Sequence, residues 1–197
     1  MHGGDYKWPL PNGGPGDWTK PLTAPLVMCE RGYHVLRDDA VLSWLGPRIF
    51  ETEYTGESIE AWGKICAHSV RLLREFGNWN ARTSRLFACD CAERALAQAG
   101  ANDERSKIAI QVARRFAQRQ ATIEELCTAR LVADEAASRA PTAVQGAMRA
   151  AAYVVCNSAS RAAANASVCA RMSSLASDKE RSWQFARLMQ YLNGEAE

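Results

Sequence analysis

The chain has 197 residues, 47% of them hydrophobic and 23% charged, which is enough apolar material for the core of one or two small domains. The formal net charge of +2 is too small for a bulk nucleic-acid binder, and the lack of a run of about 18 apolar residues predicts no membrane-spanning helix. The N-terminal sequence has no basic stretch followed by an apolar one, so we expect no secretory signal and a cytoplasmic protein.

Residues 1–25 are rich in glycine and proline, which interrupt regular structure, and they contain Trp8 and Trp18. Because burying an aromatic ring stabilises a fold, we expect this N-terminal arm to lie on the body of the protein. Residues 26–79 then read as a small α+β unit. Its predicted elements are strands at LVMC and GYHVL, a capped helix at DDAVLSWLG, a strand at RIFETEYTG that ends in a turn at Gly56, and a strand at KICAHSVRLL.

From residue 80 onward, helical periodicity replaces strand alternation, and residues 80–197 are predicted to form a helical bundle. Capping boxes at Thr122–Glu125 and Ser177–Glu180 mark two helix starts, and Gly100 marks a helix end. The predicted helices cover residues 82–99, 108–116, 122–140, 144–163 and 177–193.

Alanine is frequent on the apolar faces of these helices, so we expect the helices to approach one another closely. The predicted fold class is therefore α+β and mainly α. It consists of a small N-terminal mixed β/α unit packed on an antiparallel, alanine-rich stack of about five helices.

The chain contains seven cysteines, an odd number, which in a reducing compartment favours free buried thiols over disulfides. Two of them flank an aspartate in the stretch RLFACDCAERAL. Residues two apart on a helix point about 200° away from each other, so Cys89 and Cys91 cannot readily hold one metal ion. No CxxC redox motif is present. We expect both to be small buried hydrophobes on a helix that packs on two sides.

The same helix carries four charged residues, Arg85, Asp90, Glu93 and Arg94. Asp90 and Arg94 are four residues apart and can pair on the helix surface. Alternatively, all four form a buried polar network that fixes the helix to the N-terminal unit, a structural role rather than a catalytic one.

Two candidate sites lie in the N-terminal unit. Cys66 and His68 alternate on one predicted strand, and with Cys29 and His34 they would suit a zinc ion or a Cys–His nucleophilic pair. The usual spacing of zinc ligands is missing, and no catalytic motif surrounds these residues. We therefore predict no metal and no cofactor.

The second candidate is a nucleotide pocket. Tyr33 and His34, together with a strand glutamate such as Glu53 or Glu57, would suit an enzyme of ADP-ribosyltransferase type built on the N-terminal unit. In the alternative, these residues have a purely structural role: Gly32 makes a turn between strands, and Tyr33 and His34 fill the edge of a core.

The segment RTSRLFACDCAERAL…ERSKIAIQVARRFAQRQATIEELCTARLVADEAASRA resembles the helical putative immunity proteins of bacterial polymorphic-toxin systems, over roughly residues 80–165. The segment CERGYHVLRDDAVLSWLGPRIFETEYTGE, roughly residues 26–60, resembles a small domain of uncharacterised phage and bacterial proteins. These resemblances imply a helical fold and a protein-binding role in conflict systems. They bring no established catalytic residues.

The favoured hypothesis is a non-enzymatic inhibitor, of immunity or anti-defence type, that occludes another protein: a toxin, a nuclease or a defence effector. The alternatives are the enzyme described above and a nucleic-acid binder, which is less favoured. Arginine and glutamate dominate charged interfaces, so two groups are candidate contacts. They are the basic residues Arg161, Arg171, Arg181 and Arg187 and the acidic residues Glu51, Glu53, Glu57 and Glu60.

Overall fold

The computed structural model describes residues 7–156, 158–174 and 177–196, and the chain divides into two compact units. Unit 1 comprises Met1–Val41 and Arg48–Phe76, and unit 2 comprises Leu42–Pro47 and Gly77–Glu197. The division therefore falls three residues before the predicted boundary at 79/80. It also assigns to the helical unit a short segment, Leu42–Pro47, that sequence analysis placed in the N-terminal unit.

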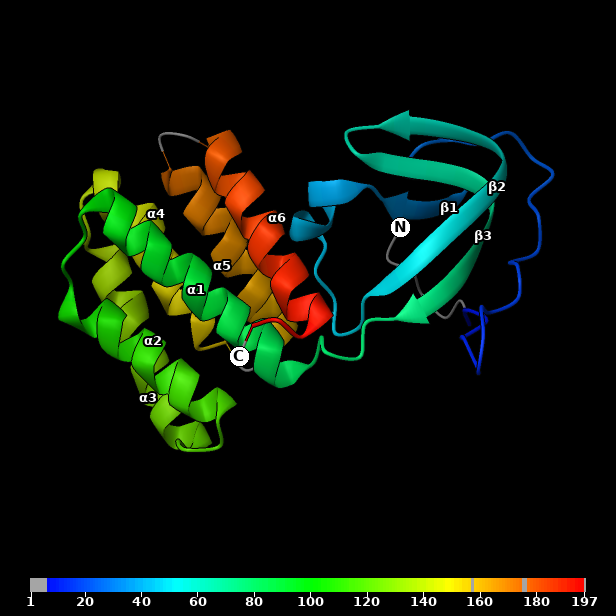
Figure 1. The fold of residues 1–197 in the computed structure, drawn as a ribbon. Coiled ribbons are helices and arrows are strands. Elements are labelled where there is room, and N and C mark those ends of the chain that lie inside the picture. Colours follow the sequence, from blue (N-terminus) through cyan, green and yellow to red (C-terminus); the bar gives the residue numbers. More distant parts are fainter. Residues whose placement is uncertain (1–6, 157, 175–176, 197) are drawn as a thin grey trace. The chain divides into compact units, whose positions relative to one another are not determined.

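Unit 1 is built on a three-stranded antiparallel sheet with the order β1-β3-β2 (Figure 1). Its strands are β1 Tyr33–Leu36, β2 Phe50–Ala61 and β3 Lys64–Glu75, which confirms three of the four predicted strands. The fourth prediction, LVMC, is wrong, because only an isolated bridge between Val27 and Arg31 forms there. The predicted turn at Gly56 is also wrong, since this glycine lies inside β2 at φ 80°, where the pairing register shifts.

The β2–β3 hairpin closes with a two-residue turn, Trp62–Gly63, between the paired residues Ala61 and Lys64. Trp62 has φ 54° and Gly63 has φ 71°. Two successive positive φ angles match the right-handed twist of a hairpin, and Asn, Asp and Gly are the residues that usually adopt them.

The N-terminal arm covers the edge of β3 beyond the reach of β1. The backbone N–H groups of Gly16, Thr19 and Leu22 donate to carbonyls of β3, over distances of 2.8, 2.9 and 3.0 Å. Trp8 packs edge-on against Tyr33, with ring centroids 5.9 Å apart. The expectation that the arm lies on folded structure is confirmed for these residues.

The predicted helix at DDAVLSWLG is a 3-10 helix, η1 Asp38–Ser43, rather than an α-helix. Gly46 and Pro47 follow too closely for α-helical turns to propagate. Its end belongs to unit 2, where Leu42 is fully buried and its carbonyl accepts a hydrogen bond from Ser167 Oγ at 3.3 Å. Trp79 Nε1 donates to the carbonyl of Gly46 at 2.9 Å.

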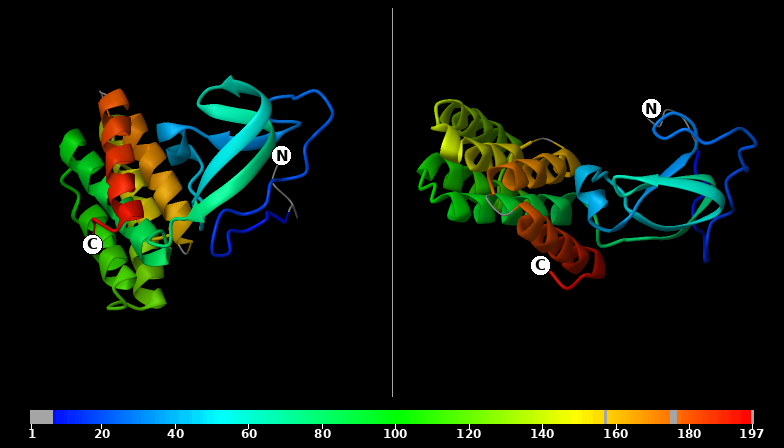
Figure 2. Two further views of the ribbon diagram at one scale, coloured as in Figure 1. Left: turned by 45° about the vertical axis from the view of Figure 1, so that its right-hand side comes forward. Right: turned by 90° about the horizontal axis from the view of Figure 1, so that it is seen from above.

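The described residues of unit 2 form six α-helices, one more than the sequence predicted. Figures 1 and 2 show how they are arranged. The predicted single helix 144–163 is two helices, because the chain leaves helical geometry after Val154 and restarts behind the N-cap Ser158. The helices are α1 Ala81–Ala99, α2 Glu104–Ala117, α3 Ile123–Ser138, α4 Thr142–Val154, α5 Ala159–Ser173 and α6 Ser177–Asn193.

Helix α1 is central in unit 2 and contacts α2, α4, α5 and α6. Alanine is the commonest buried residue of the six helices, which confirms the small apolar faces expected from the sequence. Cys89 and Cys91 are both fully buried, as expected for a helix covered on more than one side. Across the residues that the structure describes, no helix is long and apolar enough to cross a membrane.

One of the two predicted capping boxes is present. Thr122 and Glu125 exchange the reciprocal hydrogen bonds at the start of α3. At α6, Ser177 is already the first helical residue, and the Glu180 carboxylate accepts from Arg94, Gln98 and Gln184 instead. The prediction of the second capping box is wrong, because the Glu180 side chain is completely buried and pairs with Arg94 of α1.

Candidate functional site

The charged residues of α1 form a network inside unit 2, with Asp90 at its centre. The Asp90 carboxylate accepts from Arg114 at 2.8 Å, from Arg187 Nε at 2.7 Å and from the Tyr191 hydroxyl at 2.8 Å. Its side chain is only 10% exposed, and Arg114 is shared with Glu93. The carboxylate therefore links α1 to α2 and α6.

This network raises the pKa of two of its hydrogen-bond donors. Burial disfavours the charge of Arg114, but the hydrogen bonds to Glu93 and Asp90 outweigh burial and raise the pKa of the guanidinium. Burial and the adjacent Asp90 charge raise the pKa of the Tyr191 hydroxyl. Both side chains thus stay protonated near neutral pH as hydrogen-bond donors to Asp90.

Arg94 and Arg85 do not pair with Asp90. Arg94 Nε donates to Glu180 at 2.7 Å and lies over the Trp183 ring, so the predicted Asp90–Arg94 pair is wrong. The buried Arg85 donates to the carbonyl of Val154 at 2.6 Å. The described partners of the four α1 residues lie on α2, α4 and α6, so they join helices of unit 2. In one of the two alternatives of the sequence analysis, they fixed the helix to the N-terminal unit instead.

Among the described residues of unit 1, the candidate cysteines and histidines do not form a thiol–imidazole pair. His34 Nε2 accepts the backbone N–H of Cys29 at 2.9 Å, which occupies the lone pair that a general base would use. Burial lowers the pKa of His34. The Cys66 thiol donates to the Arg31 carbonyl at 3.2 Å, and burial, with the neighbouring Cys29, raises its pKa. His68 Nε2 is buried, and no hydrogen-bond partner for it occurs among the described residues.

Within the described ranges, no three or more His, Cys, Asp or Glu side chains come together in a way that would hold a metal ion. The residues of the nucleotide-pocket hypothesis are also spread apart. Tyr33 and His34 lie on β1 and Glu53 lies on β2, with β3 between them, so two strand spacings, about 10 Å, separate the two groups. Tyr33 donates its hydroxyl to the Lys20 carbonyl, and Glu53 pairs with Arg71.

Most of the acidic candidates are already in ion pairs. The pairs are Glu51–Arg74, Glu53–Arg71 and Glu60–Arg37. The first two join residues that face each other across β2 and β3, so the acidic strand is largely neutralised by unit 1 itself.

Two of the four basic candidates are used inside unit 2. Arg187 holds Asp90, and Arg171 donates to Gln184 and Ser43. Arg161 is exposed, and Arg181 is half-buried. The four arginines therefore do not form one common free surface.

The sequence analysis did not single out as a contact residue the aromatic side chain that is most exposed within the described part of unit 1. Trp62 is 85% exposed at the tip of the β2–β3 hairpin, and Ile59 and Tyr54 on β2 are 40% and 39% exposed. A Trp-Gly pair between two alternating segments is a signal for a tight hairpin turn, and a turn side chain at a hairpin tip points into solvent.

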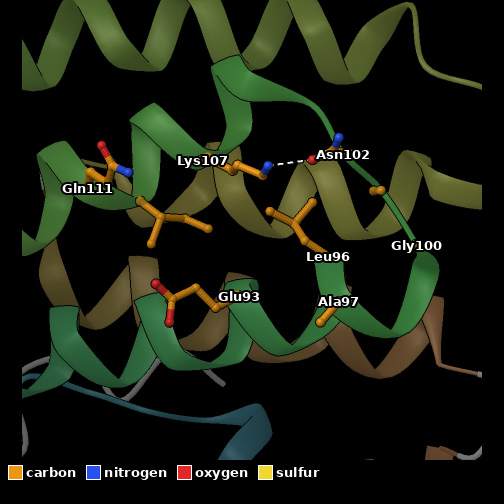
Figure 3. A pocket seen from close by; sticks show the side chains of 9 residues that line it. Glu93, Leu96, Ala97, Gly100, Asn102, Lys107 and Gln111 are labelled. Atoms are coloured by element: carbon orange, nitrogen blue, oxygen red, sulfur yellow. Dashed lines mark hydrogen bonds between the residues drawn. The ribbon is translucent and has the colours of Figure 1, made fainter.

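Pockets in unit 2 lie between helices. Figure 3 shows one between α1 and α2, a cavity of about 540 Å³ with Leu96 and Ile110 in its wall. Lys107 bonds Asn102 across it, and Glu93 is held by Arg114. The two ionisable lining residues, Lys107 and Glu93, are thus bonded to other side chains and not to each other.

Searches of family models, of curated proteins and of solved structures found no match to this chain. The similarity to helical immunity proteins therefore stays a prediction from its motifs. The geometry itself provides a buried ionic network in unit 2 and an exposed tryptophan at the hairpin tip of unit 1.

Proposed function

We propose that the chain is a non-enzymatic protein-binding protein whose β2–β3 hairpin inserts Trp62 into an apolar pocket of a partner protein. The observation that carries this proposal is the conformation of Trp62, an 85% exposed side chain on a backbone with φ 54°. Both properties are unfavourable in the isolated chain.

A non-glycine residue in the left-handed region costs about 1–2 kcal/mol. An indole left in water also forgoes the burial of up to about 250 Å² of mostly apolar surface. Glycine or asparagine at this position would remove both penalties and still close the hairpin. Tryptophan is the residue type most enriched among interface residues that dominate binding energy, so a contact to a partner would offset these costs.

The chemistry of the hairpin tip indicates the kind of partner. Ile59 is partly exposed near Trp62. On the β2 side of the tip, Glu60 pairs with Arg37, whereas Glu57 forms no ion pair within the described residues. The complementary surface is an apolar pocket with a basic rim. A nuclease or toxin presents such basic surfaces, and the proposed finer role is an inhibitor of immunity or anti-defence type that occludes such an effector.

The test compares immobilised wild-type protein with Trp62→Gly and with Leu131→Ala, which removes a 72% exposed apolar side chain from α3. Proteins retained from the native lysate are identified, produced separately and titrated by calorimetry. We expect Trp62→Gly to weaken the complex by about 30-fold or more, with thermal stability equal to or above wild type. Leu131→Ala should bind as wild type does.

Two results would overturn the proposal. One is a wild-type chain that retains no protein, and the other is a purified partner whose affinity is the same for wild type and Trp62→Gly. The enzyme alternative is tested with His34→Ala and Cys66→Ala, which should leave the affinity within a few-fold. If either change abolished an activity while the fold and the complex persisted, an enzyme on unit 1 would replace the binding protein.

A further inference from the structure

A second pocket of unit 2, a cavity of about 670 Å³, gathers positive charge. It lies where α1 and α5 begin and α2 ends, and Arg82, Arg85 and Arg119 line it together with Phe116. No acidic side chain is found among its lining residues in the described part of the chain. Within that same part, Arg82 and Arg119 form no ion pair, unlike Arg94, Arg114, Arg115 and Arg187.

The deepest of these cations is Arg85, which is 2% exposed. Its guanidinium lies 5.2 Å from the Phe116 ring centroid and donates to the carbonyl of Val154, the last residue of α4. Burial lowers the pKa of this arginine. A buried charge is costly to fold, and an anion in the adjacent cavity would lower that cost.

Arg119 reaches the same pocket from an unusual backbone position. After α2, the Arg119 N–H donates to the Phe116 carbonyl at 3.0 Å, and the Gln120 N–H donates to the Arg115 carbonyl at 2.7 Å. These two bonds define a Schellman motif, whose residue with positive φ is usually glycine. Here that residue is Arg119, with φ 62°, so the chain carries a guanidinium where glycine would be less strained.

The two helix starts add to the positive potential. Asn80 and Ala81 at the start of α1 and Ala159 at the start of α5 line the pocket. Neither helix has an acidic residue in its first turn, whereas α2, α3 and α6 do. The partial positive charge at these N-termini is therefore not neutralised by their own side chains.

We propose that this pocket binds the phosphate group of a small phosphorylated ligand of nucleotide size. Three arginines line the cavity, and guanidinium groups match the charge and the several acceptor oxygens of a phosphate better than those of a carboxylate. The cavity volume lies within the usual range for small-molecule sites, about 300–1,000 Å³. This site is in unit 2 and independent of the binding role proposed for the unit 1 hairpin.

The test is calorimetric titration of the full chain at low salt with ADP, inorganic phosphate, adenosine and a short single-stranded RNA. We expect ADP to bind with a Kd below about 1 mM, phosphate to bind more weakly and compete with ADP, and adenosine not to bind. Added salt should weaken ADP binding. No saturable ADP binding, or adenosine binding as tightly as ADP, would overturn the assignment. So would RNA that binds more tightly than ADP and is lost with the same arginines.

Variants locate the site. Arg119→Gly and Arg82→Gln should each weaken ADP binding by about 10- to 100-fold. Arg119→Gly should also leave thermal stability unchanged or raised, because glycine suits the positive φ. The matched control is Arg139→Gln, which removes a 74% exposed arginine paired with Glu135 on α3. Equal ADP affinity in Arg119→Gly, Arg82→Gln and Arg139→Gln would refute the site. Trp62→Gly should not alter ADP binding, which separates this test from that of the hairpin.

Discussion

Replacing Asp90 by asparagine removes one negative charge from between two arginines and a tyrosine. Taking one partner from a fully buried ion pair costs about 3–5 kcal/mol. Here the side chains of Arg114 and Arg187 are each 29% exposed, so water can solvate part of the charge left behind. Arg114 also keeps its pair with Glu93. We therefore expect Asp90→Asn to lower the free energy of unfolding by roughly 2–3 kcal/mol.

Urea unfolding followed by far-UV circular dichroism measures this loss, and the midpoint should fall while the denaturant slope stays constant. For a chain of this size the melting temperature should fall by about 5–10 °C. The control is Asp134→Asn, which breaks an exposed pair with Arg130 on α3 and should cost no more than about 0.5 kcal/mol. If Asp90→Asn cost no more than this control, the network would not hold α1, α2 and α6 together.

Three further predictions concern the core of the chain. In the native protein a thiol reagent should modify the exposed Cys29 and Cys127, whereas Cys89 and Cys91 should react only after unfolding. Mass spectrometry counts the modified sites, and labelling of Cys91 in the folded protein would contradict this prediction. Burial raises the pKa of Cys89 to about 12 from an ordinary 9.0, so the unfolded thiol ionises first and stability should fall as pH rises between these values. Denaturation at several pH values should show a flatter decline for Cys89→Ala, and identical slopes would exclude this contribution. Leu42→Ala should lower the free energy of unfolding by about 2–5 kcal/mol, because Leu42 is fully buried in unit 2; a loss below about 1 kcal/mol in urea titration would contradict that burial.

The elements that sequence analysis predicted correctly carry their signals within a few residues. Gly100 ends α1 in the left-handed region at φ 63°, and Thr122 begins α3 with its capping box. The break between α4 and α5 carries a weaker signal, the single N-cap Ser158. Val155, Ala159 and Ala163 continue the helical spacing across it without an intervening glycine or proline, so periodicity alone predicted one helix.

The partners of the site residues were also missed, because they are distant in the sequence. Asp90 and Arg187 are 97 residues apart, and only the packing of α6 on α1 brings them together. The nearer candidate, Arg94, was one of two alternatives, because spacing on one helix is the only geometry that a sequence provides directly. Likewise, Arg82 and Arg119 come from different helices, and their shared pocket depends on how those helices end and begin.

The placement of Leu42–Pro47 has a consequence for how this protein can change over generations. The chain passes from one unit to the other three times, after Val41, after Pro47 and after Phe76. A gene rearrangement with a single breakpoint at Gly77 would transfer the helices without the leucine that fills part of their interior. The transferred helical unit would have a cavity in its core at the position of Leu42. We therefore expect the two units to be exchanged among genomes as a pair, with recombination joints before the sheet or after the last helix.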